Sequence, residues 1–313
     1  MTKSSTGIAG RVLVVGSLNM DLVVRVSKLP SPGDTVLGSD VQSFPGGKGA
    51  NQAAAAARAG GRVSMLGKVG SDGYGQELRR ALREAGVDIT TLLEHRGPSG
   101  MAFITVDEAG ENVIVVSSGA NRRLTPDALR EELFNGVAVV LMQLETPLAT
   151  VSRVAEMATK LDIPTILNAA PARALDDTLL AGIDYLIINE GEAALLSGCS
   201  LAEATELTTF ARTAATALRA RGVGNVVVTL GGEGVLWLDE ESSGHLPAHS
   251  VAVIDTTAAG DAFCGALATS LAEGLRLERA VRFANAAGAL AATREGAQPS
   301  LPTRREITTL LTS

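Results

Sequence analysis

The sequence predicts an α/β fold: a doubly wound, mostly parallel sheet flanked by helices, with a small β-sheet lid. Two observations lead to this class. Short apolar runs recur along the chain and alternate with Ala- and Leu-rich stretches of helical spacing. The runs themselves lack polar alternation, which is typical of strands that are covered by helices on both faces of a parallel sheet.

The expected elements follow one another in βαβ order. We expect strands at 12–15, 63–66, 137–144, 165–167, 185–188 and 226–228. We expect helices at 51–59, 76–84, 149–160 and 207–221. The chain has 313 residues with no internal repeat and no linker-like stretch, so we expect a single α/β domain over residues 1–313.

Two segments, at about 21–43 and 100–118, break this alternation. The first holds the apolar run 22–26 followed by Pro30, Pro32 and Gly33, and the second contains two short strand patterns joined by a turn at 107–112. Each is expected to form antiparallel sheet inserted into the wound core. Such a sheet can close over a site as a lid or pair with a second subunit, and an edge hairpin without function is the alternative.

Composition excludes several classes of function. A net charge of −7 argues against a nucleic-acid partner, because phosphate backbones are bound by clustered Lys and Arg. Cys199 and Cys264 are far apart and lack metal-ligand spacing, so both are expected to be core thiols in a reducing compartment. Residues 1–10 are polar and the apolar run 12–15 is short, which favours a cytoplasmic location without membrane insertion.

Polar and glycine-rich segments follow several of the expected strands. These segments are 16–21, 143–145, 168, 189–192 and 229–234. In an open parallel sheet, ligands bind beyond the carboxyl ends of the strands. We therefore expect these segments to converge on one crevice.

The segment 255–261, Asp-Thr-Thr-Ala-Ala-Gly-Asp, precedes an apolar helical stretch. Small residues at a helix start leave backbone N–H groups bare, and together with the helix dipole these favour an anion. Asp261 at the edge of such an anion hole would repel phosphate, but it is well suited to accept a proton from an attacking hydroxyl. An ordinary carboxylate at a helix start is the alternative interpretation.

The segment 46–51, Gly-Gly-Lys-Gly-Ala-Asn, leads into an Ala-rich helix. It is no Walker-type phosphate loop, because Gln42 and Gly49 stand where that motif needs Gly and Ser or Thr. Bare glycines beside Lys48 and Asn51 suit close approach of a polyhydroxylated ligand, and a tight turn with a helix cap is the alternative. Residues 16–19 also lack the glycine spacing of a dinucleotide-binding fingerprint.

Taken together, these motifs resemble the ribokinase family of carbohydrate kinases, also called the PfkB family. The likeness runs almost the full length through segments 16–21, 44–52, 141–145, 168–173, 255–261 and 294–300. It implies ATP-dependent phosphoryl transfer to a sugar, with D-ribose phosphorylated at the 5-hydroxyl to D-ribose 5-phosphate as the first choice. Deoxyribose, fructose or a nucleoside as substrate, and a non-catalytic sugar-binding sensor on the same fold, stay open.

The resemblance also implies roles for individual residues. Asp261 would be the catalytic base, and the N–H groups of Ala259, Gly260 and Asp261 the anion hole. The sugar-binding set would be Asn19, Met20, Asp21, Gly47, Lys48, Gly49, Ala50, Asn51, Glu145 and Asp261. The nucleotide-binding set would be Asn189, Thr229, Leu230, Gly231, Gly232, Glu233, Gly234, Gly260, Asp261 and Asn285.

The same resemblance implies two cations and an oligomer. Asn189 and Glu192 would organise Mg²⁺ through water. A monovalent activator, K⁺, would be held by Asp255, Thr257, Ala291, Arg294, Gly296 and Ser300. Its partners would be a small sugar and a nucleotide, and the chain would form a homodimer through the lid strands.

Overall fold

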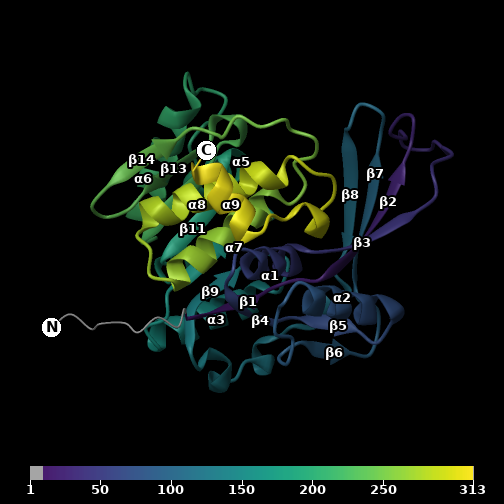
Figure 1. Cartoon of the computed structure of the whole chain (residues 1–313), viewed down its shortest axis with the longest axis horizontal. Coiled ribbons are helices and arrows are strands. Elements are labelled where there is room, and N and C mark those ends of the chain that lie inside the picture. The colour runs from purple at the N-terminus through teal and green to yellow at the C-terminus, as the bar shows by residue number, and fades with distance from the viewer. Residues whose placement is uncertain (1–9, 313) are drawn as a thin grey trace.

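A computed structural model describes residues 10–312, so the polar segment 1–9 lies outside the described residues. Its main sheet has eight strands in the order β14-β13-β12-β11-β10-β9-β1-β4 (Figure 1). The strands are β1 (Arg11–Val15), β4 (Arg62–Leu66), β9 (Val137–Met142), β10 (Thr165–Asn168), β11 (Tyr185–Asn189), β12 (Asn225–Thr229), β13 (Val235–Leu238) and β14 (Ser243–Leu246). Neighbours from β12 to β4 pair in parallel, which confirms the predicted α/β fold class.

The edge strands β13 and β14 were not predicted. They pair antiparallel with β12 and with each other. The sequence of β14 carries Ser243, Gly244 and His245, which give no apolar run to recognise. The sheet is therefore mixed at this edge.

Helices cover both faces of the sheet. They are α1 (Lys48–Arg58), α2 (Gly73–Glu84), α3 (Leu148–Lys160), α4 (Asp177–Ala181), α5 (Glu190–Ser197), α6 (Leu207–Ala220), α7 (Ala259–Ala272), α8 (Leu277–Ala291) and α9 (Arg304–Thr312). In β1, Val12 and Val14 pack in a core that includes α1, α2, α7 and α8, whereas Leu13 and Val15 pack in a second core that includes α3 to α6. This alternation is the reason that the strands are apolar throughout.

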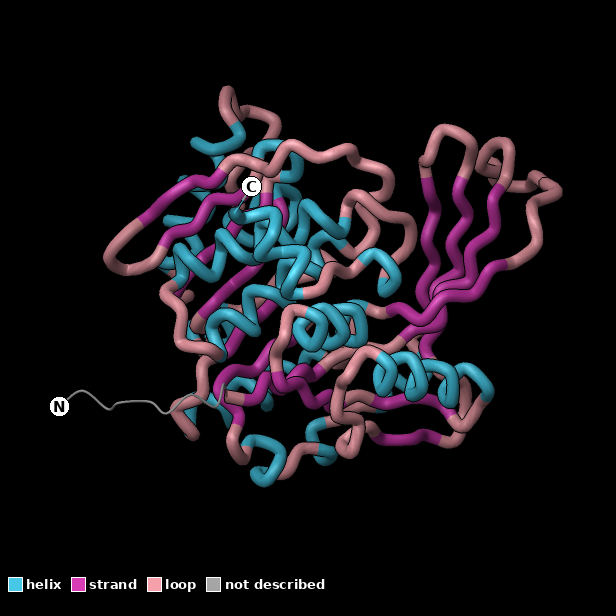
Figure 2. Tube along the Cα trace, in the orientation of Figure 1, coloured by secondary structure: helices cyan, strands magenta, loops and turns pink. Residues whose placement is uncertain are grey.

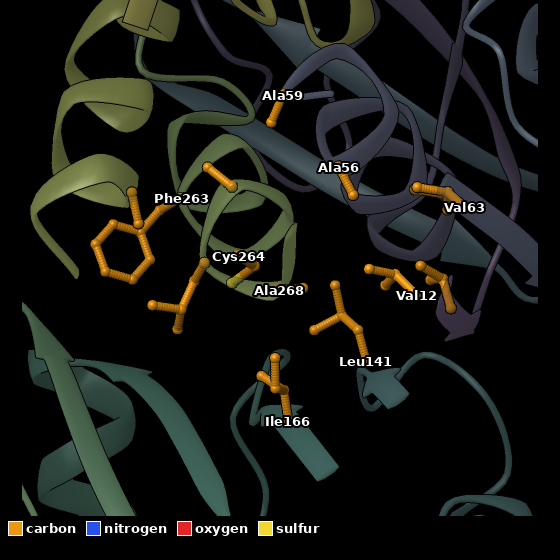
Figure 3. Packing of buried hydrophobic residues seen from close by; sticks show 14 of the residues in the cluster. Val12, Ala56, Ala59, Val63, Leu141, Ile166, Phe263, Cys264 and Ala268 are labelled. Atoms are coloured by element: carbon orange, nitrogen blue, oxygen red, sulfur yellow. The ribbon is translucent and has the colours of Figure 1, made fainter. Parts of the chain in front are cut away.

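Helices α1 and α7 pack against each other unusually closely over the first of these cores. A Cβ atom at Gly265 would lie 2.6 Å from the backbone N of Ala56 and 2.6 Å from the carbonyl O of Gln52. One turn after Gly265 on α7, Thr269 Oγ1 donates to the Ala56 carbonyl at 2.9 Å. Figure 3 shows Ala56 of α1 and Cys264 and Ala268 of α7 in one cluster with Val12, Leu141 and Ile166 of the sheet. Small side chains thus set the spacing of the two helices that carry the predicted motifs.

The two inserted segments form one separate four-stranded sheet, in the order β3-β2-β7-β8, which we call the lid sheet. Its strands are β2 (Asn19–Arg25), β3 (Gln42–Gly46), β7 (Gly100–Val106) and β8 (Asn112–Ser117). Figures 1 and 2 show it projecting away from the helices of the main body. Each insertion is antiparallel within itself, but β2 and β7 join the two in parallel, which the sequence did not indicate.

A further pair of short parallel strands, β5 (Lys68–Gly70) and β6 (Leu93–His95), lies beside α2. Among residues 10–312 no helix combines the length and the apolar character needed to cross a membrane. Within the same range Cys199 and Cys264 are both free thiols, and Cys264 is buried in α7.

Candidate active site

A cavity of about 220 Å³ opens where the carboxyl ends of β10, β11 and β12 face the first turn of α7. Strand-end residues and the helix start line it together, as expected for an open parallel sheet. Its lining residues are Lys48, Asn168, Ala170, Ile187, Asn189, Glu192, Thr229, Thr256, Ala258, Gly260, Asp261 and Cys264. The segments 46–51 and 255–261, about two hundred residues apart in the chain, therefore meet at one cavity.

Asp261 is held in a fixed orientation in the first turn of α7. Its side chain is only 7% exposed. Asn51 Nδ2 donates to Asp261 Oδ2 at 3.0 Å, and Gln52 Nε2 donates to Asp261 Oδ1 at 2.9 Å. Each carboxylate oxygen thus receives one amide hydrogen from α1, and each keeps a lone pair for another donor. This arrangement is suited to a proton acceptor.

The N-terminus of α7 presents unpaired backbone donors to the same cavity. Ala258 caps the helix in the left-handed conformation, with φ of 59°. Within the described chain, the N–H groups of Gly260 and Asp261 have no protein acceptor. The N–H of Ala259 differs from the prediction, because it donates to the Thr256 carbonyl at 3.1 Å and closes a turn. Of the three predicted donors, those of Gly260 and Asp261 therefore stay available to an anion.

The turn before α1 depends on glycine at two positions. Gly47 has φ of 87°, a left-handed conformation that disfavours side chains, and a Cβ there would lie 2.6 Å from the backbone N of Asn19. At Gly49 a Cβ would lie 2.5 Å from the backbone N of Ser17. The turn consequently packs directly on the segment that links β1 to β2, and the two predicted parts of the sugar-binding set adjoin each other.

The side chains beside this turn offer mainly hydrogen-bond acceptors. Glu145 Oε2 accepts from Ser17 Oγ and from the backbone N–H of Lys48, which leaves Oε1 free of these contacts. Asn51 Oδ1 is buried and accepts no hydrogen bond from any described residue. Acceptors of this kind match the hydroxyl donors of a polyol.

Asn19 contributes the opposite polarity. Its Oδ1 accepts from Asn121 Nδ2 at 2.8 Å, so its own amide nitrogen remains as a donor. By contrast, Met20 and Ala50 are fully buried in the hydrophobic core, and any contact they make with a ligand is through the backbone. The predicted sugar-binding set is therefore divided between polar side chains and close-packed backbone.

Negative charge is concentrated around this site. Burial, together with the charges of Glu145 and Asp261, raises the pKa of Asp21 to about 7. Burial by itself would lower the pKa of Lys48, but the facing carboxylates of Asp261, Glu145 and Glu192 raise it instead. Lys48 therefore stays charged and partly offsets a cluster of acidic side chains.

The predicted nucleotide side lies at the ends of β11 and β12. Asn189 caps α5 in a capping box: its Oδ1 accepts from Glu192 N at 2.8 Å, and Glu192 Oε2 accepts from Asn189 N at 2.9 Å. Burial raises the pKa of Glu192, opposed by its bond to Asn189 and by Lys48. Both residues line the cavity together with Thr229.

Gly260 and Asp261 of the same set also line the cavity, whereas Leu230 to Gly234 and Asn285 do not. The turn Gly231–Glu233 follows β12, with Leu230 N–H bonded to the Gly234 carbonyl at 2.8 Å. Asn285 in α8 is half-buried, and its Nδ2 donates to the Pro247 carbonyl at 2.9 Å. The cavity lining therefore contains only part of the predicted nucleotide-binding set.

The positions predicted to hold a monovalent cation lie in the loop before α7 and in the segment that runs from the end of α8 at Ala291 to Ser300. Asp255 joins these two segments, because its Oδ1 accepts from Thr257 N and its Oδ2 from Gly296 N, both at 2.9 Å. These bonds lower the pKa of Asp255 against the opposing effect of burial. Arg294 N–H donates to the Ala291 carbonyl at 3.2 Å, and Ser300 Oγ donates to the Ala297 carbonyl at 2.8 Å. The oxygen ligands available to a cation at these positions are a carboxylate, backbone carbonyls and a hydroxyl, which are the groups that a hard cation prefers.

Several polar residues of the site were given no role from sequence. They are Ser17, Gln52, Asn121, Gln143 and Asn168, all of which are buried. Asn168 and Gln143 carried a usable signal, because each ends an apolar strand run. Gln52 stands among alanines on α1, where a polar side chain has no reason to be buried without a partner. Asn121 gave no signal of this kind.

An oriented proton acceptor, bare helix N–H groups and a pocket rich in hydroxyl acceptors define a kinase of small polyhydroxylated molecules. Residues 9–304 match the family model described as pfkB family carbohydrate kinase. The chain belongs to this family, and it is therefore a phosphotransferase that acts on a sugar hydroxyl.

Individual relatives agree with this assignment over nearly their whole length. The chain is 42% identical to a ribokinase of Bacillus subtilis over 307 residues, covering 96% of this chain and 99% of that protein. It is 41% identical to a ribokinase of Haemophilus influenzae over 296 residues, covering 94% and 95%. A solved structure of Arabidopsis thaliana ribokinase with ribose and ATP matches with a TM-score of 0.89 at 31% identity, covering 98% and 100%.

Asp21 gives the site a pH dependence whose sign can be tested. The folded chain holds a proton on Asp21 up to about pH 7, whereas an unfolded Asp loses it near pH 4. Between these values the folded state binds more protons, so this group makes stability fall as pH rises through the window. Asp21→Asn should therefore stabilise the ligand-free protein at pH 8, and the gain should shrink steadily toward pH 4.

The measurement is the free energy of urea unfolding of both proteins at several pH values. Asp40→Asn, an exposed carboxylate of the same insertion, is the matched control and should show little change. A gain for Asp21→Asn that stayed constant, or grew toward low pH, would contradict this assignment of buried charge.

Proposed function

We propose that this protein is an ATP-dependent kinase of D-ribose that phosphorylates the 5-hydroxyl to give D-ribose 5-phosphate, with Asp261 as the general base. One observation carries the proposal. The Asp261 carboxylate is oriented by Asn51 and Gln52, and it lies in the same cavity as the bare N–H groups of Gly260 and Asp261. The ribokinase names of the full-length relatives support ribose as the sugar.

In the proposed reaction the sugar lies between the 46–51 turn and the lid sheet. Its hydroxyls donate to Asp21 and to the free acceptors of Glu145 and Asn51, which fixes the 5-hydroxyl against Asp261. Asp261 takes the proton of that hydroxyl as its oxygen attacks the γ-phosphorus of ATP and the bond to the β-phosphate oxygen breaks. ADP leaves with the electron pair of that bond.

The charge of the transferring group is met by the start of α7. The N–H groups of Gly260 and Asp261 stabilise it with preorganised dipoles, and Lys48 contributes a positive charge at the cavity wall. A bound Mg²⁺ would neutralise phosphate charge. Glu192 suits a water-mediated contact to that ion, because its Oε1 is free of the capping-box bond that Oε2 makes.

Replacing the base should separate chemistry from binding. Asp261→Asn keeps an acceptor oxygen but cannot take the proton, so we expect kcat to fall by roughly 10²- to 10⁴-fold. Sugar affinity, measured by calorimetry, should stay within a few-fold of wild type because the hydroxyl contacts remain. The assay is ribose-dependent ADP release.

A matched control tests whether Asp261 is only a carboxylate at a helix start. Glu278 occupies the first turn of α8 and is exposed. Glu278→Gln should leave kcat unchanged. If Asp261→Asn retained near-normal turnover, the base would have to be sought elsewhere.

We further propose that K⁺ binds between the two segments that Asp255 joins. The ligands would be the Asp255 carboxylate, Ser300, and backbone oxygens at Thr257, Ala291, Arg294 and Gly296. The loop 255–257 leads directly into the start of α7, so an ion there would order the anion-binding turn without touching substrate.

Potassium dependence can be measured with and without turnover. Replacing Na⁺ with K⁺ in the buffer should raise both the kcat and the Tm of the wild-type protein. Asp255→Asn should raise the K⁺ concentration for half of the Tm shift by at least about tenfold. Asp239→Asn, which removes a carboxylate that holds another turn through Ser242 N, should leave the K⁺ response intact. An equal response to Na⁺ and K⁺ in the wild-type protein would argue against the site.

We propose that residues 1–313 act as one domain whose lid sheet also joins two subunits. The edge strand β8 of the lid sheet exposes Val113, Ile114, Val115 and Val116 by 48–61%. A patch of this kind is typical of an interface. Sedimentation should give about twice 32.1 kDa for the wild type and 32.1 kDa for Val115→Lys/Ile114→Lys. Leu195→Lys on α5 is the control, and a monomeric wild type would contradict the proposal.

Cytoplasmic location follows from the proposed substrate, because the reaction consumes ATP. The free thiols of Cys199 and Cys264 fit a reducing compartment. Cell fractionation tests this point, and activity confined to an exported fraction would contradict it.

A further inference from the structure

A polar side chain of α1 is buried against the carboxylate of the proposed base. Gln52 is 0% exposed and is followed on its helix by Ala53, Ala54, Ala55 and Ala56. Its Nε2 donates to Asp261 Oδ1 at 2.9 Å and to Asn168 Oδ1 at 3.0 Å. Both hydrogens of the amide are thereby used. The side chain bridges α7 and the carboxyl end of β10.

The chemistry of the neighbours fixes which way this amide points. An ionised carboxylate only accepts hydrogen bonds, so Gln52 must turn its nitrogen toward Asp261. Its oxygen then faces Gln143, whose Nε2 donates to Gln52 Oε1 at 2.6 Å. The orientation of the Gln143 amide is therefore fixed as well. Gln143 donates to Gln52, and Gln52 donates to Asp261, so these two hydrogen bonds form a chain that points toward the carboxylate.

The far end of this chain is anchored in the sheet. Gln143 is 0% exposed and follows β9 directly. A Cβ at Gly16 would lie 2.0 Å from Gln143 Oε1, so glycine at this position makes the room that the amide occupies. Asn168 is held in turn, with its Nδ2 donating to the Ile187 carbonyl at 3.3 Å. The amide chain thus rests on β9, β10 and β11.

We propose that Gln52 is the positioning residue for Asp261, and that Gln143 acts through Gln52 to fix the base at the end of the sheet. The proposal rests on Asp261 being the base. It assigns a role in the chemical step to residues that touch neither sugar nor nucleotide. Asn51 donates to the other oxygen of Asp261 but also belongs to the predicted sugar-binding set. Of the two amide donors, Gln52 is therefore the one that can be replaced without loss of a sugar contact.

The alternative is that these amides only fill space between α1, α7 and the sheet. Packing between the two helices has its own polar tie in Thr269, which donates to the Ala56 carbonyl and does not touch Asp261. If the amides only fill space, loss of the Gln52 bonds and loss of the Thr269 bond should have similar effects on kcat. A positioning role predicts that only the amide chain affects turnover.

The experiment compares kcat, ribose dissociation constant and Tm for four variants. Gln52→Met removes the donors with little change of volume, and kcat should fall about 10- to 100-fold while ribose affinity stays within about threefold. Gln143→Met should lower kcat less, by about 3- to 10-fold, because Gln52 keeps its contact with the base. The double variant should match Gln52→Met alone, since Gln143 acts only through Gln52.

The control is Thr269→Val, which should lower Tm yet leave kcat within about twofold. Additive losses in the double variant, or a comparable loss of kcat in the control, would assign the amides to packing and overturn the proposal. So would wild-type kcat in Gln52→Met while Asp261→Asn is inactive, and that result would leave the base assignment standing. Full activity of Asp261→Asn would overturn both. If Gln52→Met does not fold, a wild-type kcat in Gln143→Met is enough to reject the proposed positioning role of the two amides.

Discussion

The close approach of α1 to α7 is the constraint on which the site depends. Gly265 admits the backbone of α1 at Ala56 and Gln52, because a Cβ there would lie 2.6 Å from Ala56 N and from Gln52 O. Since interiors are close-packed, a larger residue at this contact would move one helix relative to the other. Asn51 and Gln52 reach Asp261 only at this spacing. The same small residues that shape the core therefore also set the geometry of the proposed base.

The site concentrates carboxylates while its substrates are a neutral sugar and an anionic nucleotide. Burial, together with the charges of Glu145 and Asp261, raises the pKa of Asp21 to about 7. Acceptors of this density suit sugar hydroxyls, whereas in the proposed reaction the phosphate charge would be met by the N–H groups of α7 and by Lys48. The proposed function thus assigns the acceptors to the sugar and the donors to the phosphate.

Much of this arrangement follows from local sequence. The apolar runs of β1, β9 and β11 indicated a covered parallel sheet, and the glycines before Lys48 and Asp261 indicated helix starts open to a ligand. Asp261 and Lys48 do line one cavity, while their chemical roles stay predictions.

Other features depend on tertiary contacts that no local pattern encodes. Gln52 and Asp261 are 209 residues apart, so their bond cannot be seen in helical periodicity. The parallel pairing of β2 with β7 likewise joins segments that each looked like a separate antiparallel hairpin. The family resemblance implied a bare N–H at Ala259, yet that N–H donates to the Thr256 carbonyl and closes a turn. The first two differences arise because another segment supplies the bonding partner, and the third arises from the conformation of the turn.

In the proposed reaction the proton acceptor and the anion-binding amides converge on one reacting centre at the start of α7. A crystal structure with ribose, ADP and aluminium fluoride tests it most directly, because the fluoride occupies the place of the transferring phosphoryl group. We expect the fluorine atoms to accept from the N–H groups of Gly260 and Asp261, with the ribose 5-hydroxyl within hydrogen-bond distance of the Asp261 carboxylate. Fluoride bound away from α7, or a ribose hydroxyl directed to another side chain, would contradict it.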